Sequence, residues 1–530
     1  MPRTQALAPI ISEPVRSVAD SDDVIPDLDT VTLNSAIKYR RNVSFVASLF
    51  AMVCGGTLYL FSAYATTCPC KFNSIYLRAV KLTSPFSVAE KLGYTQTQMN
   101  LIASAGGLGL YLSGPAMGSF VDQYGPKKVV LASAVLLFTG YSCMALTFNG
   151  TFAHSSFLLV AVSYGLVGLG SAGSYNAAIT TNVRNFHPRD HGFVVGISVS
   201  LFGLSAFIFS QLSAFFYRRP LSAESLSAPH HEAIDTYAFL MFLAWATGGA
   251  NLVATLGLTD LSKDTGIVYQ RRSSESVHVG EERRGLLPTE EEGSGIDVRV
   301  EDTQPSARAP NREDRHISVD ASLFQSTDAW ILFVAFLLLT GTGLMFINNI
   351  GAIVVSLFPL ASDPVLISKA QARQVSIISV FNCAGRIITG LASDTAQRKW
   401  GTHRLSFMIM GAGLLAVTQA ALAVSSSMDV LHIWTALVGF SYGSLFSSAP
   451  VIVGTWFGIK KFGTHWGWFQ WGPAAGGQLW NTVFGAIMDA SRPIKPDAEC
   501  KGSHCFQLAF VLTALRALAL AAPNVGIFDI

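Results

Sequence analysis

Long apolar runs separated by short polar segments set the pattern of this chain. A helix that crosses a bilayer needs about 20 consecutive, mostly apolar residues. Twelve runs approach or exceed that length, and the last one is interrupted by Arg516. The runs are residues 44–66, 97–121, 129–148, 155–180, 191–216, 236–258, 329–358, 371–393, 404–424, 430–457, 463–488 and 506–522. The pattern predicts an all-α membrane protein with twelve transmembrane helices.

Composition agrees with this fold class. Half of the 530 residues are hydrophobic and 13% are charged, whereas about 25% of residues are charged in soluble proteins. A soluble protein with buried helices would not need so many long uncharged runs. The net charge is only +2 and no basic stripe is present, so nucleic-acid binding is not expected.

Two polar regions interrupt the apolar pattern and define the domain organisation. The N-terminal region is acidic, and the central region combines charges, Ser, Pro and Gly with few aromatic residues, so it cannot bury enough apolar surface to order. The predicted divisions are a disordered cytosolic N-terminus at 1–40, a six-helix half at 41–258, a disordered cytosolic linker at 259–327, a second six-helix half at 328–522 and a short tail at 523–530.

Basic residues predict the orientation. Lys38, Arg40 and Arg41 directly precede the first apolar run, and no secretory signal opens the chain. Because cytosolic loops are enriched in Lys and Arg, we expect the N-terminus to face the cytosol. The turn that contains Lys127 and Lys128 would then be cytosolic as well.

The second half of the chain repeats small and acidic positions of the first half at nearly one offset. The matched positions, each 271 or 272 residues apart, are Gly118 and Gly390, Asp122 and Asp394, Gly192 and Gly463, and Gly196 and Gly467. Several matches in chain order at one spacing indicate two homologous halves in parallel, a layout of one large transporter class.

The repeated motif is specific. Gly118-x-x-x-Asp122-x-x-Gly125 is followed by Lys127 and Lys128 between the second and third spans. This motif and its later echo resemble the signature of the major facilitator superfamily. Pro126 stands where that family usually has Arg, so Lys127 and Lys128 are expected to supply the charge. The resemblance implies a major facilitator fold in which seven residues gate the cytosolic side: Gly118, Asp122, Gly125, Lys127, Lys128, Gly390 and Asp394.

Three longer segments, residues 56–64, 92–100 and 184–196, resemble the nodulin-like branch of that superfamily and its fungal monocarboxylate-transporter homologues. The resemblance implies secondary active transport of a small, carboxylate-type solute by alternating access. It also favours the vacuolar membrane, with the plasma membrane as the alternative. A coupling proton stays open as a second partner.

A buried cation marks the candidate substrate site. Arg386 lies inside the eighth span, where a guanidinium suits bidentate recognition of a carboxylate, although a structural ion pair is the alternative. Asn348 and Asn349 are two adjacent amides in the apolar seventh span, which need a cavity or a neighbouring helix.

The same resemblance bears on this site. Arg386 with Gly390 looks like the Arg-x-x-x-Gly of monocarboxylate transporters, where the Arg engages substrate carboxylate. Asn382 stands where those transporters carry a proton-coupling Asp, and Tyr64 lies in the region of their first-span lysine. With Asn348 and Asn349, these residues form the predicted substrate site.

Four cysteines, Cys68, Cys70, Cys500 and Cys505, fall in loops predicted to lie on the outer, oxidising side. A disulfide is expected, with three pairings open. A metal site is the alternative, but only His504 is suitably spaced to join it.

The central linker contains one short motif. Glu282-Arg-Arg-Gly-Leu286-Leu287 fits an acidic dileucine sorting signal.

No nucleophile and base, metal-ligand spacing or phosphate loop indicates an enzyme, so we expect no catalytic residues, no metal and no cofactor. The predicted partners are a small-molecule substrate and the lipid bilayer, and we expect a monomer. The alternative function is a non-transporting membrane sensor or scaffold with a transporter fold.

Overall fold

The computed structural model describes residues 28–60, 96–152, 157–216, 218–219, 233–262, 323–359, 364–424, 427–491 and 500–521, and every structural statement below concerns these residues. Several predictions fall outside them: the disorder predicted for residues 1–27 and 263–322, the role of Tyr64, the sorting motif at Glu282, Leu286 and Leu287, the pairing of Cys68 and Cys70, and the tail at 523–530.

The first helix group is built from the N-terminal part of the chain. It comprises α1 (Leu28–Gly55), the 3-10 turn η1 (Gly56–Leu60), α5 (Gln96–Leu112), α6 (Gly114–Tyr124), α7 (Pro126–Asn149), α8 (Phe157–Asn185), the 3-10 turn η2 (Pro188–Asp190), α9 (His191–Phe216) and α10 (Thr236–Gly257). Two strands, β1 (Arg218–Arg219) and β2 (Ala233–Ile234), pair antiparallel between α9 and α10.

The second helix group follows the central region. It comprises the 3-10 turn η3 (Leu323–Gln325), α12 (Thr327–Leu357), α13 (Pro364–Trp400), α14 (Arg404–Val424), α15 (Met428–Phe457), α16 (Phe462–Phe469), α17 (Trp471–Ala490), the 3-10 turn η4 (Ser503–Cys505) and α18 (Gln507–Ala521).

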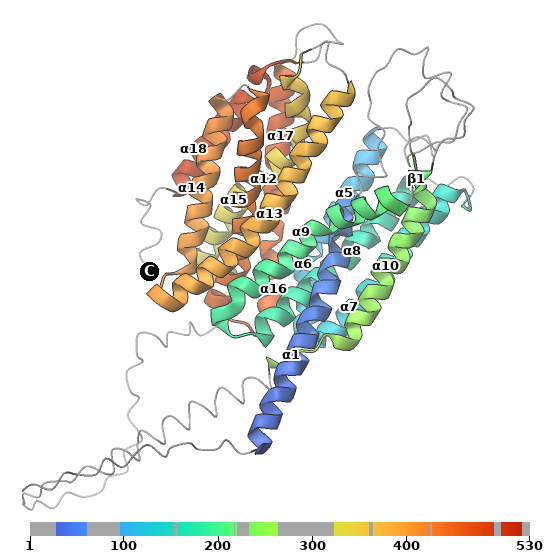
Figure 1. Ribbon diagram of the computed structural model, residues 1–530, viewed down its shortest axis with the longest axis vertical. Helices are drawn as coiled ribbons and strands as arrows, with labels where there is room; N and C mark the ends of the chain where they lie inside the picture. The colour runs from blue at the N-terminus through green and yellow to red at the C-terminus, as the bar shows by residue number, and fades with distance from the viewer. Residues whose placement is uncertain are drawn as a thin grey trace, which may run out of the picture.

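The two groups lie beside each other and meet mainly at one end. In Figure 1 they diverge toward the top of the view and come together lower down, near α6, α9 and α16. The most extensive contacts between groups are those of α9 with α13 and α15, of α16 with α6 and α8, and of α17 with α5, and η2 also contacts α13. We call the end where α6 meets α16 the latch end.

Most of the predicted spans appear as single long helices. Nine helices in the described part of the chain are long and apolar enough to cross a membrane. Of the remaining predicted spans, 97–121 and 463–488 are each divided into two helices, and 506–522 contains the 15-residue helix α18. All twelve predicted spans therefore contain helix in the part of the chain that the structure describes, and nine of the helices there meet the length and hydropathy expected of a complete span.

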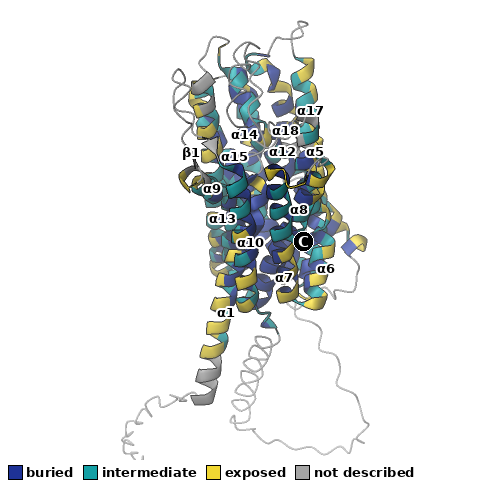
Figure 2. Cartoon of the chain, turned by 90° about the vertical axis from the view of Figure 1, so that its right-hand side faces the viewer, coloured by how far each residue is buried: buried dark blue, intermediate teal, exposed yellow. Residues whose placement is uncertain are grey.

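The outside of the bundle is apolar, as expected for a protein surrounded by lipid. Exposed residues follow the outer faces of the helices in Figure 2, while buried ones face inward. Large apolar side chains are among the most exposed, including Trp245, Leu256 and Val424 at 65%, 80% and 82% exposure. A soluble protein would not leave so much apolar surface in water. The chain is an integral multi-pass membrane protein.

Both divided helices carry proline close to the break. α5 ends at Leu112 and α6 begins at Gly114 with Pro115 in its first turn. α16 and α17 join at Gln470, three residues before Pro473. Proline has no backbone N–H and its ring clashes with the preceding turn, so a helix bends or breaks at such a position.

Two predicted boundaries are wrong. Residues 28–40 were expected to be disordered, but α1 begins at Leu28. A helix that the membrane span has already nucleated extends through neighbouring residues at little cost, since each added residue contributes one hydrogen bond. The predicted linker also begins too early: Leu261 is buried, and its N–H donates to Asn185 Oδ1 at 2.7 Å.

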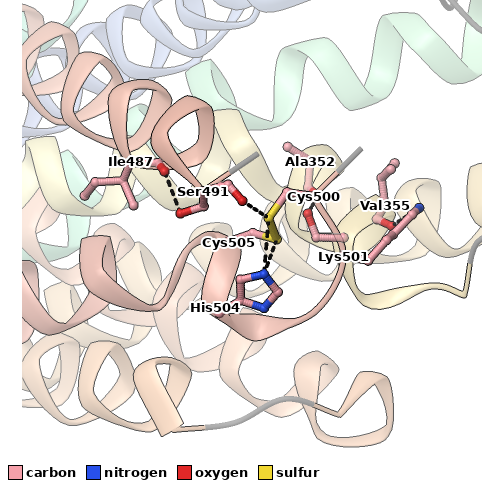
Figure 3. Close-up of a disulfide and its surroundings, with 9 residues drawn as sticks. Ala352, Val355, Ile487, Ser491, Cys500, Lys501, His504 and Cys505 are labelled. Atoms are coloured by element: carbon pink, nitrogen blue, oxygen red, sulfur yellow. Dashed lines mark hydrogen bonds between the residues drawn. A yellow bond between two sulfur atoms is a disulfide. The ribbon is translucent and has the colours of Figure 1, made fainter. Parts of the chain in front are cut away.

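One disulfide fastens the loop before α18. Cys500 and Cys505 are bonded, and the intervening loop contacts the end of α12 (Figure 3). Gly502 N–H donates to the Ser356 carbonyl at 2.7 Å, and Lys501 Nζ donates to the Val355 carbonyl at 2.9 Å. The expected disulfide is thus confirmed for this pair. A metal bound by the same two sulfurs with His504 would require them as free thiolates.

Candidate functional site

A cavity of about 450 Å³ lies between the two helix groups. Its volume falls within the range of about 300–1,000 Å³ that is typical of small-molecule sites. Arg386 and three amide side chains lie among its polar lining groups, and eight aromatic rings line it as well. The amides are Asn348, Asn382 and Gln470, and the rings are Tyr59, Tyr111, Tyr175, Phe202, Phe336, Tyr442, Phe446 and Trp466.

Arg386 lies where α13 of the second group contacts α9 of the first. It projects from α13, is 5% exposed, and donates from Nη1 to the Val199 carbonyl on α9. Its guanidinium lies 5.6 Å from the centre of the Phe446 ring. Gly203 makes room for it, because a Cβ there would lie 2.4 Å from Arg386 Nη1.

No carboxylate within the described residues pairs with Arg386. Its Nε is buried without a hydrogen-bond partner there. A buried charge normally requires a counter-ion and satisfied hydrogen bonds, since desolvation alone is costly. The arrangement therefore leaves a cation beside a cavity with capacity to bind an anion.

The predicted amides divide into two settings. Asn348 is exposed and lines the cavity, and Asn382 lines it with Oδ1 buried and unpartnered among the described residues. Asn349 instead donates from Nδ2 to Asn481 Oδ1 on α17 at 2.8 Å. Asn348 and Asn382 are thus placed to meet a solute, whereas Asn349 joins two helices.

A pair of buried amides closes the cavity toward the latch end. Gln470 Nε2 donates to Asn176 Oδ1 at 2.7 Å, which connects the α16–α17 joint to α8 in the other group. Both residues are at most 5% exposed. Because Gln470 also lines the cavity, one side chain contacts both the solute space and the opposite helix group.

Asp122 forms the first of two matching contacts at the latch end. Its carboxylate accepts hydrogen bonds from the N–H groups of Gly463 and Thr464 at 3.1 and 2.7 Å, and from Thr464 Oγ1 at 2.7 Å. These N–H groups belong to the first turn of α16, where free donors and the helix dipole favour an anion. Arg184 pairs with Asp122 at 2.6 Å and with Asp260 at 3.1 Å.

Asp394 forms the second contact in the same way. It accepts hydrogen bonds from the N–H groups of Gly192 and Phe193, at 3.0 and 2.7 Å, in the first turn of α9. Arg404 pairs with it at 2.7 Å. Each aspartate therefore binds the start of a helix in the opposite group.

The repeated glycines lie face to face at these contacts. A Cβ on Gly118 would lie 1.8 Å from the Gly463 carbonyl oxygen, and one on Gly390 would lie 2.2 Å from that of Gly192. Backbones approach so closely only where no side chain intervenes. Gly125 serves differently, since its φ of +82° at the turn into α7 favours glycine.

The structure differs from the prediction in which cation pairs with Asp122 and in which residues line the cavity. Lys127 and Lys128 are exposed, and the cation that pairs with Asp122 is Arg184. Arg184 lies 62 residues further along the chain, so local spacing could not identify it. Trp466 was not among the predicted site residues, but it is fully buried and lines the cavity.

Comparison with known proteins places this geometry in context. Residues 57–222 match the family model described as Major Facilitator Superfamily. A protein of Emericella nidulans named "Probable transporter mch1" is 27% identical, over 78% of this chain and 77% of its own length. A protein of Wickerhamomyces anomalus named "Probable transporter MCH1" is also 27% identical, over 92% of this chain and 87% of its own length.

Solved structures show the fold. The superfamily transporter FucP in the outward conformation aligns with a TM-score of 0.51 over 91% of this chain and 99% of its own, at 12% identity. The proton:xylose symporter XylE aligns with a TM-score of 0.52 over 92% and 96%, also at 12% identity. The chain resembles the major facilitator superfamily in sequence and has a major facilitator fold.

Proposed function

We propose that this relative of the major facilitator superfamily is a secondary active transporter of a small anionic solute of carboxylate type. The observation that carries the proposal is Arg386: a buried guanidinium, without a carboxylate partner in the described part of the chain, beside a cavity between two helix groups. Arg presents donors in a planar fork that matches a carboxylate. Relatives named as transporters support the coarser assignment to membrane transport.

Transport would proceed by alternating access. Each helix group would act as one six-helix half, and the halves would rock about the cavity. Asp122 and Asp394 would hold the latch end closed while the opposite end admits the solute. In this proposal the latch end faces the cytosol, because cytosolic loops are enriched in Lys and Arg. Asn348 and Asn382 would orient the bound solute.

The remaining parts of the proposal are expectations from the sequence. The vacuolar membrane is favoured over the plasma membrane, and the protein would act as a monomer without catalytic chemistry. Position 382 is Asn, which does not titrate. Proton coupling would therefore need a titratable group elsewhere.

Uptake into membrane vesicles tests the central claim. Radiolabelled lactate, pyruvate and benzoate are offered at neutral pH, and rates are corrected for protein-free vesicles and protein amount. Arg386→Ala should reduce uptake to background, and Arg386→Lys should retain little, because an ammonium keeps the charge but loses the bidentate fork. Arg373→Ala is the matched control, since Arg373 is an exposed arginine on the same helix.

Two results would contradict the proposal. Uptake unchanged by Arg386→Ala would remove Arg386 from the solute site. Binding of these acids to the purified wild-type chain without any uptake would favour the alternative of a membrane sensor with a transporter fold.

A further inference from the structure

The aromatic character of the cavity exceeds what an anion alone requires. Eight rings line it, but Arg386 is the only ionisable cation and no Asp or Glu is present in the described lining. We propose that the solute is a planar aromatic monocarboxylate, whose carboxylate binds Arg386 and whose ring lies between two aromatic walls. This inference rests on the proposed function, because it uses the same cation.

The first helix group supplies one wall. Phe202 on α9 lies at its centre, with ring-centre distances of 4.9 Å to Tyr175 and 5.8 Å to Tyr59. Both pairs are edge-to-face, with interplanar angles of 62° and 88°. Tyr59 is further held by a hydrogen bond of 2.8 Å between its hydroxyl and that of Tyr111. The wall is therefore fixed before a solute enters.

The second helix group supplies the facing wall. Phe446 lies 4.8 Å from Tyr442 and 5.3 Å from Phe336, and Phe336 lies 5.8 Å from Trp466. Arg386 rests against the Phe446 ring at 5.6 Å, so the cation is placed at the edge of this wall. A solute whose carboxylate binds Arg386 would place its body in the cavity that both walls line.

Ring geometry favours a flat aromatic body over a saturated one. Aromatic pairs prefer edge-to-face and offset arrangements, which a saturated ring or a short aliphatic chain cannot reproduce. Such pairs improve binding by about twofold to tenfold each beyond the effect of buried area. A single cation with no second basic group in the described lining favours one carboxylate over two.

Binding of matched acids to the purified full chain in lipid nanodiscs tests this selectivity. Benzoate and cyclohexanecarboxylate have the same number of carbons and the same carboxylate, but only benzoate is planar and aromatic. Titration calorimetry should give benzoate an affinity at least about tenfold higher. Lactate, which has no ring, should bind more weakly than either.

A substitution in the first wall isolates the ring contribution. Phe202→Leu keeps an apolar side chain and should weaken benzoate binding about threefold to tenfold, while changing cyclohexanecarboxylate less than about twofold. Phe209→Leu is the matched control: Phe209 lies on the same helix, is equally buried at 6% against 7%, and does not line the cavity. The ratio of the two affinities does not depend on the fraction of folded protein.

The outcomes separate this inference from the proposed function. In one outcome, benzoate and cyclohexanecarboxylate bind with equal affinity to the wild type and not at all to Arg386→Ala. That result would overturn the aromatic selectivity but would still support Arg386 as the anion-binding residue. Binding of all acids unaffected by Arg386→Ala would overturn both. A benzoate preference that Phe209→Leu reduces as much as Phe202→Leu would also overturn the role assigned to the wall.

Discussion

At the latch end, each charged contact of an aspartate lies one helical turn from a close backbone contact of a glycine. Asp122 and Asp394 each bind the first turn of a helix in the other group, and glycines one turn earlier allow the backbones to meet. A carboxylate at a helix N-terminus is favoured by the free N–H groups and the helix dipole. These two residues therefore make a closed latch end favourable without any covalent connection.

Asp122→Asn should weaken the closed latch. The amide keeps one acceptor oxygen but loses the charge that pairs with Arg184. Arg184 then keeps one carboxylate partner, Asp260, together with its hydrogen bonds to the Ile459 and Lys460 carbonyls. If the closed state weakens by about 1.4 kcal/mol, its population relative to the open state falls about tenfold. Vesicle uptake should fall by about that factor, while protein abundance changes less than about twofold.

Asp328→Asn is the control, because Asp328 is an exposed aspartate in the first turn of α12. Equal losses of abundance and uptake in Asp122→Asn would make Asp122 a purely structural residue.

Gly118→Ala should separate α6 from α16. The added Cβ would overlap the Gly463 carbonyl oxygen, which is backbone and cannot rotate away. Overpacking of this kind costs about 1–3 kcal/mol. The variant should lower the midpoint of thermal unfolding in detergent and slow uptake. Gly107→Ala, with no atom within 4 Å of its new Cβ, should leave both unchanged; a similar loss there would refute the packing explanation.

At the residue scale, sequence could identify groups that are unusual in their surroundings. Arg386 and the Asn348–Asn349 pair stand out because charges and amides are rare in apolar spans. Tyr59, Tyr175 and Tyr442 do not stand out, since aromatic residues are common in such helices whether they face lipid or a cavity. Arg184 was not identified as the partner of Asp122 because that pairing depends on tertiary structure.

At the scale of secondary-structure elements, the helix breaks and the disulfide loop are the features that distinguish this chain from a set of plain apolar helices. The apolar pattern predicted the positions of the helices, because length and hydropathy decide which segments can cross a bilayer. It did not predict the joint at Gln470. A joint there depends on Pro473 and on the contact of Gln470 with Asn176, and the second of these is tertiary.

Cys505→Ser should destabilise the loop that covers the end of α12. Closing a loop of this length contributes about 2 kcal/mol in the chain-entropy account. Its loss would also free Lys501 and Gly502 from the carbonyls at the end of α12. The midpoint of thermal unfolding should fall, and a reducing agent should lower the wild type to the same value.

Cys143→Ser controls for the loss of a thiol, since Cys143 is free. If the unfolding midpoint of Cys505→Ser matched that of the oxidised wild type, the disulfide would add no stability.

For the whole molecule, the arrangement of the two groups explains why the repeat pattern was informative. Positions related by the offset of about 271 residues do not contact their own counterparts. Gly118 meets Gly463, and Gly390 meets Gly192. The glycine of the first repeated pair in each half therefore contacts the glycine of the second repeated pair in the other half. Such crossed pairing is expected when two similar bodies face each other across an approximate twofold axis. The sequence predicted the repeat, but the crossed contacts required coordinates.

Crosslinking the latch end separates binding from transport. Asp190 and Arg398 have half-exposed side chains, lie in opposite groups and form an ion pair at 3.5 Å. In the double variant Asp190→Cys with Arg398→Cys, a short bifunctional thiol reagent should join the groups. Rocking requires these groups to separate, so vesicle uptake of benzoate should stop, while calorimetric binding persists because the cavity remains accessible from the opposite end.

Each single-cysteine variant, treated with the same reagent, controls for reaction at Cys54, Cys143 and Cys383. Uptake that continues in the crosslinked protein would show that the solute passes without separation of the latch end, which is incompatible with rocking halves. Loss of both binding and uptake would instead mean that the solute enters the cavity from the latch end, and not from the opposite end as proposed.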